Sequence, residues 1–166
     1  MKYKNILLLG AALLFSVSIV HADSIDWGIM GGGDDAISPK LVVGDFSHTY
    51  EFTLTDAASL IVKADEFNCR CSKLNIKDDT FSMVLKDSIG NAWSDKGGTS
   101  LMLSLEDLAA GNYALSIAGT GDGQLFAAKN IGVYEVGVSV VPIPGAILLF
   151  GSGLVGLGGV FRSNRG

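Results

Sequence analysis

The sequence has few of the residues that most enzymes use for catalysis. Among 166 residues there are only two histidines and two cysteines. His21 lies in an N-terminal segment that we expect to be removed, so His48 is the one histidine of the mature chain. A Ser-His-Asp triad would need His48 with Asp45 or Asp56, but the body of the chain has no G-x-S-x-G elbow. We expect His48 to be a surface residue, and the sequence predicts no catalytic residue and no enzymatic activity.

The two cysteines, Cys69 and Cys71, are too few for a disulfide framework or a metal site. A C-x-C disulfide closes a very small ring, and in a strand the two cysteines would lie near the upper limit of the Cα separation that a disulfide allows. In an exported protein the pair could form this bond, or the thiols could stay free or pair between chains. Two thiolates without nearby histidine do not complete a zinc shell, so we predict no metal and no cofactor.

Basic residues are also scarce between the two ends of the chain. Four of the twelve lie in the apolar ends, so residues 23–141 carry eight basic residues against all seventeen acidic ones, a formal net charge of −9. Such a body repels phosphate groups, which excludes nucleic acid as a partner and disfavours anionic lipid headgroups.

Apolar residues are abundant instead, and they gather at the two ends of the chain. At the N-terminus, Lys2 and Lys4 precede an apolar stretch over residues 6–20. Small residues at the −3 and −1 positions then predict signal-peptide cleavage between Ala22 and Asp23. A retained anchor is the alternative, although the apolar stretch is short for a bilayer span. The domains that we expect are a signal peptide (1–22), a globular body (23–141) and a C-terminal segment (142–166).

Short runs of alternating apolar and polar residues fill the body. A period of two, rich in aromatic and β-branched residues, indicates half-buried strands. Clear runs occupy residues 50–55, 81–85, 113–117 and 134–140, and weaker ones residues 40–43, 60–64, 101–105 and 125–128. We expect residues 23–40, rich in glycine and aspartate, to be irregular, and residues 104–110 to form one helical turn. The fold class predicted is all-β: an antiparallel, jelly-roll-like β-sandwich of about eight strands, flanked by the signal peptide and a C-terminal transmembrane helix.

The body also resembles a known family of exported bacterial proteins. Its patterns are F-x-x-x-Y-x-F-T-L from Phe46, F-x-x-x-L-x-D-x-x-G-N from Phe81, L-x-A-G-N-Y-A-L-S-I-A-G-T from Leu108, and a final Y-x-V-x-V-S-V. Over residues 44–140 they resemble the FxDxF-type PEP-CTERM family and, more loosely, pre-peptidase C-terminal domains. The family's aspartate falls on His48, which leaves the role of that position open.

A binding module is an alternative function for such a sandwich. Three acid pairs begin at Asp34, Asp65 and Asp78, and paired carboxylates in loops can chelate Ca²⁺. Trp27 and Trp93 could stack on sugars if they are exposed. The plainer interpretation is turn-forming aspartates and core tryptophans.

The C-terminal segment could cross a membrane. Residues 138–161 form an uncharged segment that is long enough to span a bilayer. Glycines recur along this segment at spacings that lipid-embedded helices tolerate. Arg162 and Arg165 follow at once and would remain on the cytoplasmic side. Pro142 and Pro144 favour an extended chain just outside the membrane.

The complete pattern V-P-I-P-G-A-x-L-L-F-G-S-G-L-x-G-L-x-G-x-x-R over residues 141–162 closely resembles the PEP-CTERM class of sorting signals, in its V-P-x-P variant. The resemblance implies recognition of Val141, Pro142, Ile143 and Pro144 by an exosortase-type membrane protease, with the two arginines as the cytoplasmic stop. The cut chain would go from the inner membrane to the cell surface or an exopolysaccharide matrix, as in biofilms. An uncleaved, membrane-anchored periplasmic protein is the alternative.

Overall fold

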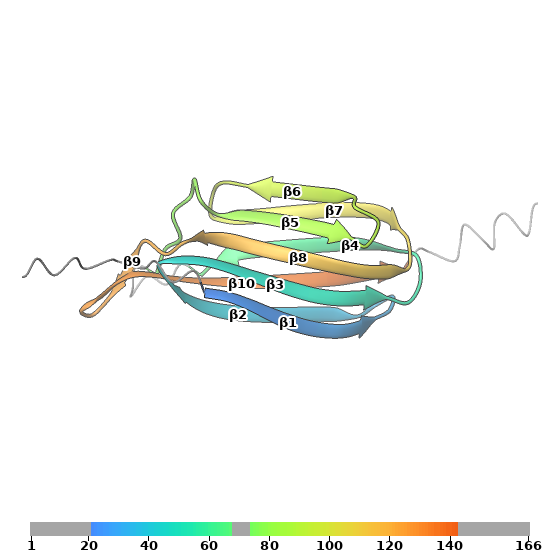
Figure 1. Ribbon diagram of the computed structural model, residues 1–166, viewed down its shortest axis with the longest axis horizontal. Coiled ribbons are helices and arrows are strands. Elements are labelled where there is room, and N and C mark those ends of the chain that lie inside the picture. The colour runs from blue at the N-terminus through green and yellow to red at the C-terminus, as the bar shows by residue number, and fades with distance from the viewer. Residues whose placement is uncertain (1–20, 68–73, 143–166) are drawn as a thin grey trace, which may run out of the picture.

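Ten strands form two facing sheets in the computed structural model, which describes residues 21–67 and 74–142 (Figure 1). The first sheet has the order β1-β3-β8-β5-β6 and the second the order β2-β10-β4-β7, with β9 beside β10. The strands are β1 (His21–Met30), β2 (Asp35–Val43), β3 (Asp45–Leu54), β4 (Ala58–Glu66), β5 (Ser82–Asp87), β6 (Ala92–Lys96), β7 (Ser100–Leu108), β8 (Gly111–Thr120), β9 (Gly123–Leu125) and β10 (Ala128–Pro142).

The chain passes back and forth between the two sheets. Over the described residues, only β5–β6 and β9–β10 are sequential neighbours that pair with each other. Because β1 and β3 are separated by β2 in the opposite sheet, they run in the same direction and pair in parallel. The remaining pairs are antiparallel. The predicted all-β sandwich is confirmed, with ten strands rather than about eight and with one parallel pair.

The core lies between the sheets and follows the predicted alternation. In β3, for example, every second residue from Phe46 to Leu54 is buried, while Ser47, Thr49, Glu51 and Thr53 face outward. Strands β4, β5, β8 and β10 contribute their alternate apolar residues in the same way. Each large side chain buried in this layer contributes about 1.5–3 kcal/mol through removal of apolar surface from water.

The prediction that residues 23–40 are irregular is wrong, because one edge strand of each sheet, β1 and β2, covers most of them. In β1 the pairing register shifts between Asp26 and Gly28, where Gly28 has a φ of +74°. This bulge moves the inward positions from odd to even residues, from Ile25 and Trp27 to Met30. A strand whose period of two is interrupted in this way does not show the pattern on which the prediction depends.

The first half of β2 was not predicted as a strand because its large apolar side chains face the solvent and not the core. Ile37 and Leu41 are each 65% exposed on the outer face, whereas Ser38 and Lys40 point toward the other sheet. The helical turn predicted over residues 104–110 is also wrong, since residues 100–108 form β7. Leu101 and Leu103 are on its buried face, and this period of two favours a strand over a turn of helix.

Several predictions lie outside the described residues. These are the signal peptide up to residue 20, the cysteine pair, and the C-terminal segment from residue 143 onward, including Arg162 and Arg165. Within residues 21–67 and 74–142, no helix is long and apolar enough to span a bilayer.

Candidate functional site

His48, expected at the surface, is buried between the two sheets. Its side chain is 5% exposed, and Nδ1 lies 2.5 Å from the hydroxyl of Tyr134. That hydroxyl is 2.9 Å from the hydroxyl of Tyr50, so three polar groups form one chain inside the core. Burial raises the pKa of both tyrosines, which therefore stay protonated. The surface prediction failed because the inward face of β3 carries Phe46, His48 and Tyr50 in alternation.

An ion pair beside this cluster joins β1 and β2, which are edge strands of opposite sheets. The Lys40 ammonium group on β2 lies 3.0 Å from the Asp23 carboxylate on β1, and Asp23 is the register partner of His48. The hydrogen bond and charge of Lys40 lower the pKa of Asp23 below its ordinary value. Ala22 and Asp23, the residues on either side of the predicted signal-peptide cut, both lie in β1. The mature chain is therefore expected to begin within this strand.

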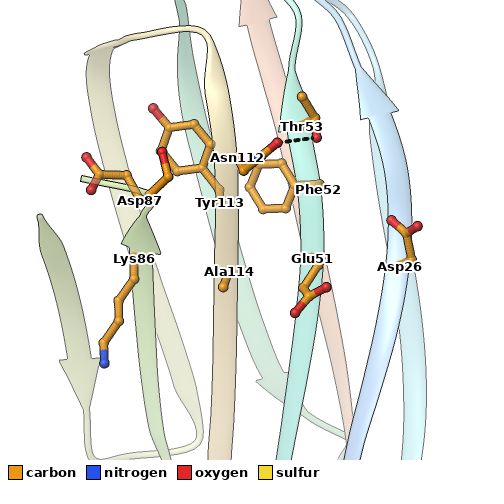
Figure 2. A pocket seen from close by; sticks show the side chains of 10 residues that line it. Asp26, Glu51, Phe52, Thr53, Lys86, Asp87, Asn112, Tyr113 and Ala114 are labelled. Atoms are coloured by element: carbon orange, nitrogen blue, oxygen red, sulfur yellow. Dashed lines mark hydrogen bonds between the residues drawn. The ribbon is translucent and has the colours of Figure 1, made fainter. Parts of the chain in front are cut away.

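The outer face of the first sheet holds a polar groove with a volume of about 430 Å³ (Figure 2). Its lining comes from β1, β3, β5 and β8 and the turn after β5, and consists of Asp26, Glu51, Phe52, Thr53, Lys86, Asp87, Ser88, Asn112, Tyr113 and Ala114. Figure 2 shows Glu51 between Asp26 on the neighbouring edge strand and Ala114 on β8, with Lys86 beyond Ala114. The small side chain of Ala114 leaves the floor of the groove open between charges of opposite sign.

One end of the groove is held by hydrogen bonds. The hydroxyl of Thr53 donates to Oδ1 of Asn112 over 2.7 Å. Asp87 accepts hydrogen bonds from the backbone N–H groups of Ile89 and Asn91. Although desolvation opposes the change, these bonds together with the Asn91 side chain lower the pKa of Asp87. Asp87 therefore shapes the β5–β6 turn. Asp26 also accepts a local hydrogen bond, through Oδ1 from the backbone N–H of Gly28 at 2.7 Å. The charged groups left to meet a ligand are therefore Glu51, Lys86 and Oδ2 of Asp26.

Two of the three acid pairs considered as alternative calcium ligands make local hydrogen bonds in the described chain. Asp34 accepts a hydrogen bond from the backbone N–H of Gly31 at 2.7 Å, and Asp65 accepts one from the hydroxyl of Ser100. Glu66 accepts the backbone N–H of Ile76 at 2.7 Å. Across residues 21–67 and 74–142, no three His, Cys, Asp or Glu side chains are grouped closely enough to hold a metal ion.

Both tryptophans pack against the core, as the plainer interpretation expected. Trp27 and Trp93 are partly buried, and the Trp27 ring centroid lies 4.6 Å from that of Tyr50. Neither ring lines the polar groove. The stacking role proposed for them as sugar platforms therefore has no support from their placement.

The predicted sorting motif begins within the last strand of the sandwich, at residues that are exposed to solvent. Val141 and Pro142 are the last two residues of β10 and pair with Ser59 and Ala58 of β4. Ile143 and Pro144 lie outside the described residues. The structure thus places half of the motif at the end of a strand, where the sequence predicted only an extended segment outside the membrane.

The groove was missed by sequence reasoning. Its charged residues occupy outward positions of strands that are far apart in the sequence, and an outward charge on a strand is the ordinary solvated case. The parallel partner of β3, which brings Asp26 beside Glu51, has no local signal in the sequence.

Comparison with known proteins gives likenesses of fold only. No protein-family model and no curated protein matches the sequence. The pre-peptidase C-terminal domain of a collagenase from Bacillus anthracis is 12% identical, with a TM-score of 0.46 over 72% of this chain and 96% of that one. PliG of Aeromonas hydrophila, a periplasmic inhibitor of g-type lysozyme, is 11% identical, with a TM-score of 0.41 over 72% and 99%. CsCBM6-3 of Clostridium stercorarium, solved in complex with cellobiose, is 6% identical, with a TM-score of 0.35 over 70% and 99%.

Proposed function

We propose that this chain is a non-enzymatic exported bacterial protein whose C-terminus is a PEP-CTERM-type sorting signal. An exosortase-type protease cuts near the V-P-I-P motif and releases the sandwich to the cell surface or exopolysaccharide matrix. The pattern over residues 141–162 carries this proposal, because proline motif, glycine-rich apolar span and arginine end occur together in one uninterrupted stretch. A plain anchor would need the apolar span and the arginines but not the prolines.

The position of the motif agrees with this function. Strand β10 leads directly into it, so the sandwich is joined to the predicted span by the motif itself. The strongly acidic body repels nucleic acid and anionic lipid headgroups, so neither is an expected partner. Its expected partners are the protease, the inner membrane during transit, and the matrix afterwards.

Mass spectrometry of the mature C-terminus tests the proposal. The full chain is produced in a host that carries an exosortase and in the same host with that gene deleted. We expect the extracellular protein to end near Pro144 in the first host and the chain to stay membrane-bound in the second. The variant with Pro142→Ala and Pro144→Ala should remain uncut, while Pro39→Ala, in the edge strand β2, should be processed normally. An extracellular form that still carries Arg165 would overturn the sorting function and leave the anchored alternative.

A second candidate function is the binding of a polar saccharide in the groove of Figure 2. The observation that favours it is the set of hydrogen-bonding groups on both sides of Ala114, with Glu51 and Asp26 facing Lys86 across the floor. Glycan-array and calorimetric titrations of residues 23–142 test it, with Glu51→Gln and Lys86→Met as variants. Binding that both variants weaken supports the candidate, and flat titrations of the parent protein remove it. A calcium titration in parallel tests the metal alternative.

A further inference from the structure

The last two residues of β10 are held by β4 on one side. Val141 pairs with Ser59 and Pro142 with Ala58, at the point where β4 begins. One residue earlier, Val140 is a buried core residue that pairs with Leu60. Because β10 is an inner strand of its sheet, the chain that leads into the sorting motif is part of the packed sandwich and not a free linker.

The β1–β2 loop holds the same end of β10 on its other side. The backbone N–H of Gly33 donates to the carbonyl oxygen of Val140 at 2.7 Å, and the N–H of Val140 donates to the carbonyl oxygen of Asp34 at 2.9 Å. Gly32 lies so close to the Pro142 ring that a Cβ on it would be 3.0 Å from both Cβ and Cγ of the proline. The loop backbone thus packs directly on the first proline of the motif.

From these contacts we infer that the folded sandwich withholds half of the sorting motif from the protease, so that tail removal waits for Val141 and Pro142 to leave β4 and the loop. The inference rests on the proposed function. A protease binds its substrate as an extended chain through backbone groups and side-chain pockets. Val141 is 39% exposed and Pro142 is exposed, but β4 pairs with the backbone of both residues. The loop at Gly32 also packs on the Pro142 ring, so a protease has to displace the strand and the loop before it can bind this stretch as an extended chain. Cutting therefore proceeds through a minor state in which the end of β10 has opened.

Two glycine variants separate this effect from general loosening of the loop. Gly32→Ala places a Cβ against Pro142 and should displace it, whereas the nearest atom to a Cβ at Gly31 is Oγ1 of Thr55 at an ordinary 3.4 Å. Both substitutions are glycine to alanine in the same loop, so they change the unfolded chain alike. We expect the tail of Gly32→Ala to be removed several times faster than that of the parent, and the tail of Gly31→Ala at the parent rate.

A linker variant keeps the test independent of how Gly32→Ala folds. Four residues, Gly-Ser-Gly-Ser, are inserted between Val140 and Val141, which moves the intact motif out of the strand. Since two strand-end pairs and the loop contact together account for roughly a factor of ten in equilibrium constant, tail removal should accelerate by about tenfold. The same insertion in the β6–β7 turn, between Gly97 and Gly98, serves as the control and should leave the rate unchanged.

The measurement is a pulse-chase of the full chain in exosortase-carrying cells, with the half-time of tail loss followed by mass shift. Faster loss in the linker variant and in Gly32→Ala, with unchanged controls, supports the inference. Equal half-times for the parent and the linker variant, with the tail removed from both, overturn the inference while the proposed function stands. A tail that is never removed from any variant, the parent included, overturns the proposed function itself.

Discussion

Replacing Tyr134 with phenylalanine should destabilise the sandwich through the loss of one hydroxyl group. That hydroxyl is the middle of the buried chain, 2.5 Å from Nδ1 of His48 and 2.9 Å from the hydroxyl of Tyr50. The ring is fully buried and stacks on Phe46 with centroids 5.3 Å apart, and phenylalanine retains this packing. Two buried hydrogen bonds at about 1 kcal/mol each predict a loss of about 2 kcal/mol in the free energy of unfolding.

The matched control is Tyr113→Phe, because among residues 21–67 and 74–142 the Tyr113 hydroxyl makes one hydrogen bond, to the carbonyl oxygen of Ala109 at 2.7 Å. Its expected cost is about 1 kcal/mol or less. Urea unfolding of residues 23–142, followed by tryptophan fluorescence, measures both variants. The slope of the unfolding free energy against urea concentration should be the same for the parent and both variants. In thermal unfolding, the melting temperature of Tyr134→Phe should fall by about 8 °C, at roughly 4 °C per kcal/mol. If Tyr134→Phe costs no more than Tyr113→Phe, the chain of polar groups does not stabilise the core and the reasoning fails.

Three further predictions concern the packing and the charges. Leu115→Ala removes a fully buried side chain and should cost about 2–5 kcal/mol in urea unfolding, whereas Ile89→Ala, at an 84% exposed position, should stay within about 0.5 kcal/mol of the parent. Gly121→Ala would place a Cβ 2.4 Å from the backbone oxygen of Asn130, and we expect it to lower the thermal midpoint far more than Gly31→Ala, or to prevent folding. Burial raises the pKa of Glu66, so its ionised form is disfavoured in the folded state, and the stability present under acid is lost as the pH rises through that pKa. Glu66→Gln should therefore have a higher urea midpoint than the parent at pH 7 and the same midpoint at pH 3. A lower midpoint than the parent at pH 7 would contradict the upward direction of the pKa shift.

The inner strands were predictable because both of their neighbours in the sheet and the opposite sheet cover them. Residues 50–54 and 134–140 show an uninterrupted period of two, and these residues lie within β3 and β10. Two edge strands, β1 and β2, were not predictable in the same way. The bulge at Trp27 breaks the period of β1, and β2 turns Ile37 and Leu41 outward. An edge strand has fewer neighbours, so burial imposes a weaker pattern on its sequence.

The groove depends on tertiary structure alone. Asp26 comes beside Glu51 only because the chain visits the opposite sheet in β2 before it returns as β3, and Lys86 arrives from a strand more than thirty residues further along. The burial of His48 has the same origin, since its partner Tyr134 is 86 residues away. Contacts between distant segments leave no periodic signal in either segment.

The sequence by itself determined the alternating inner strands, the acidic body and the tail pattern on which the sorting proposal depends. These features are local, because a strand face or a recognition motif is written in consecutive residues. Only the tertiary structure decided which face His48 occupies, which charges share the groove, and how the motif begins. Val141 and Pro142 read as the start of an extended signal in the sequence, and the fold makes them the held end of β10 because β4 and the β1–β2 loop meet there.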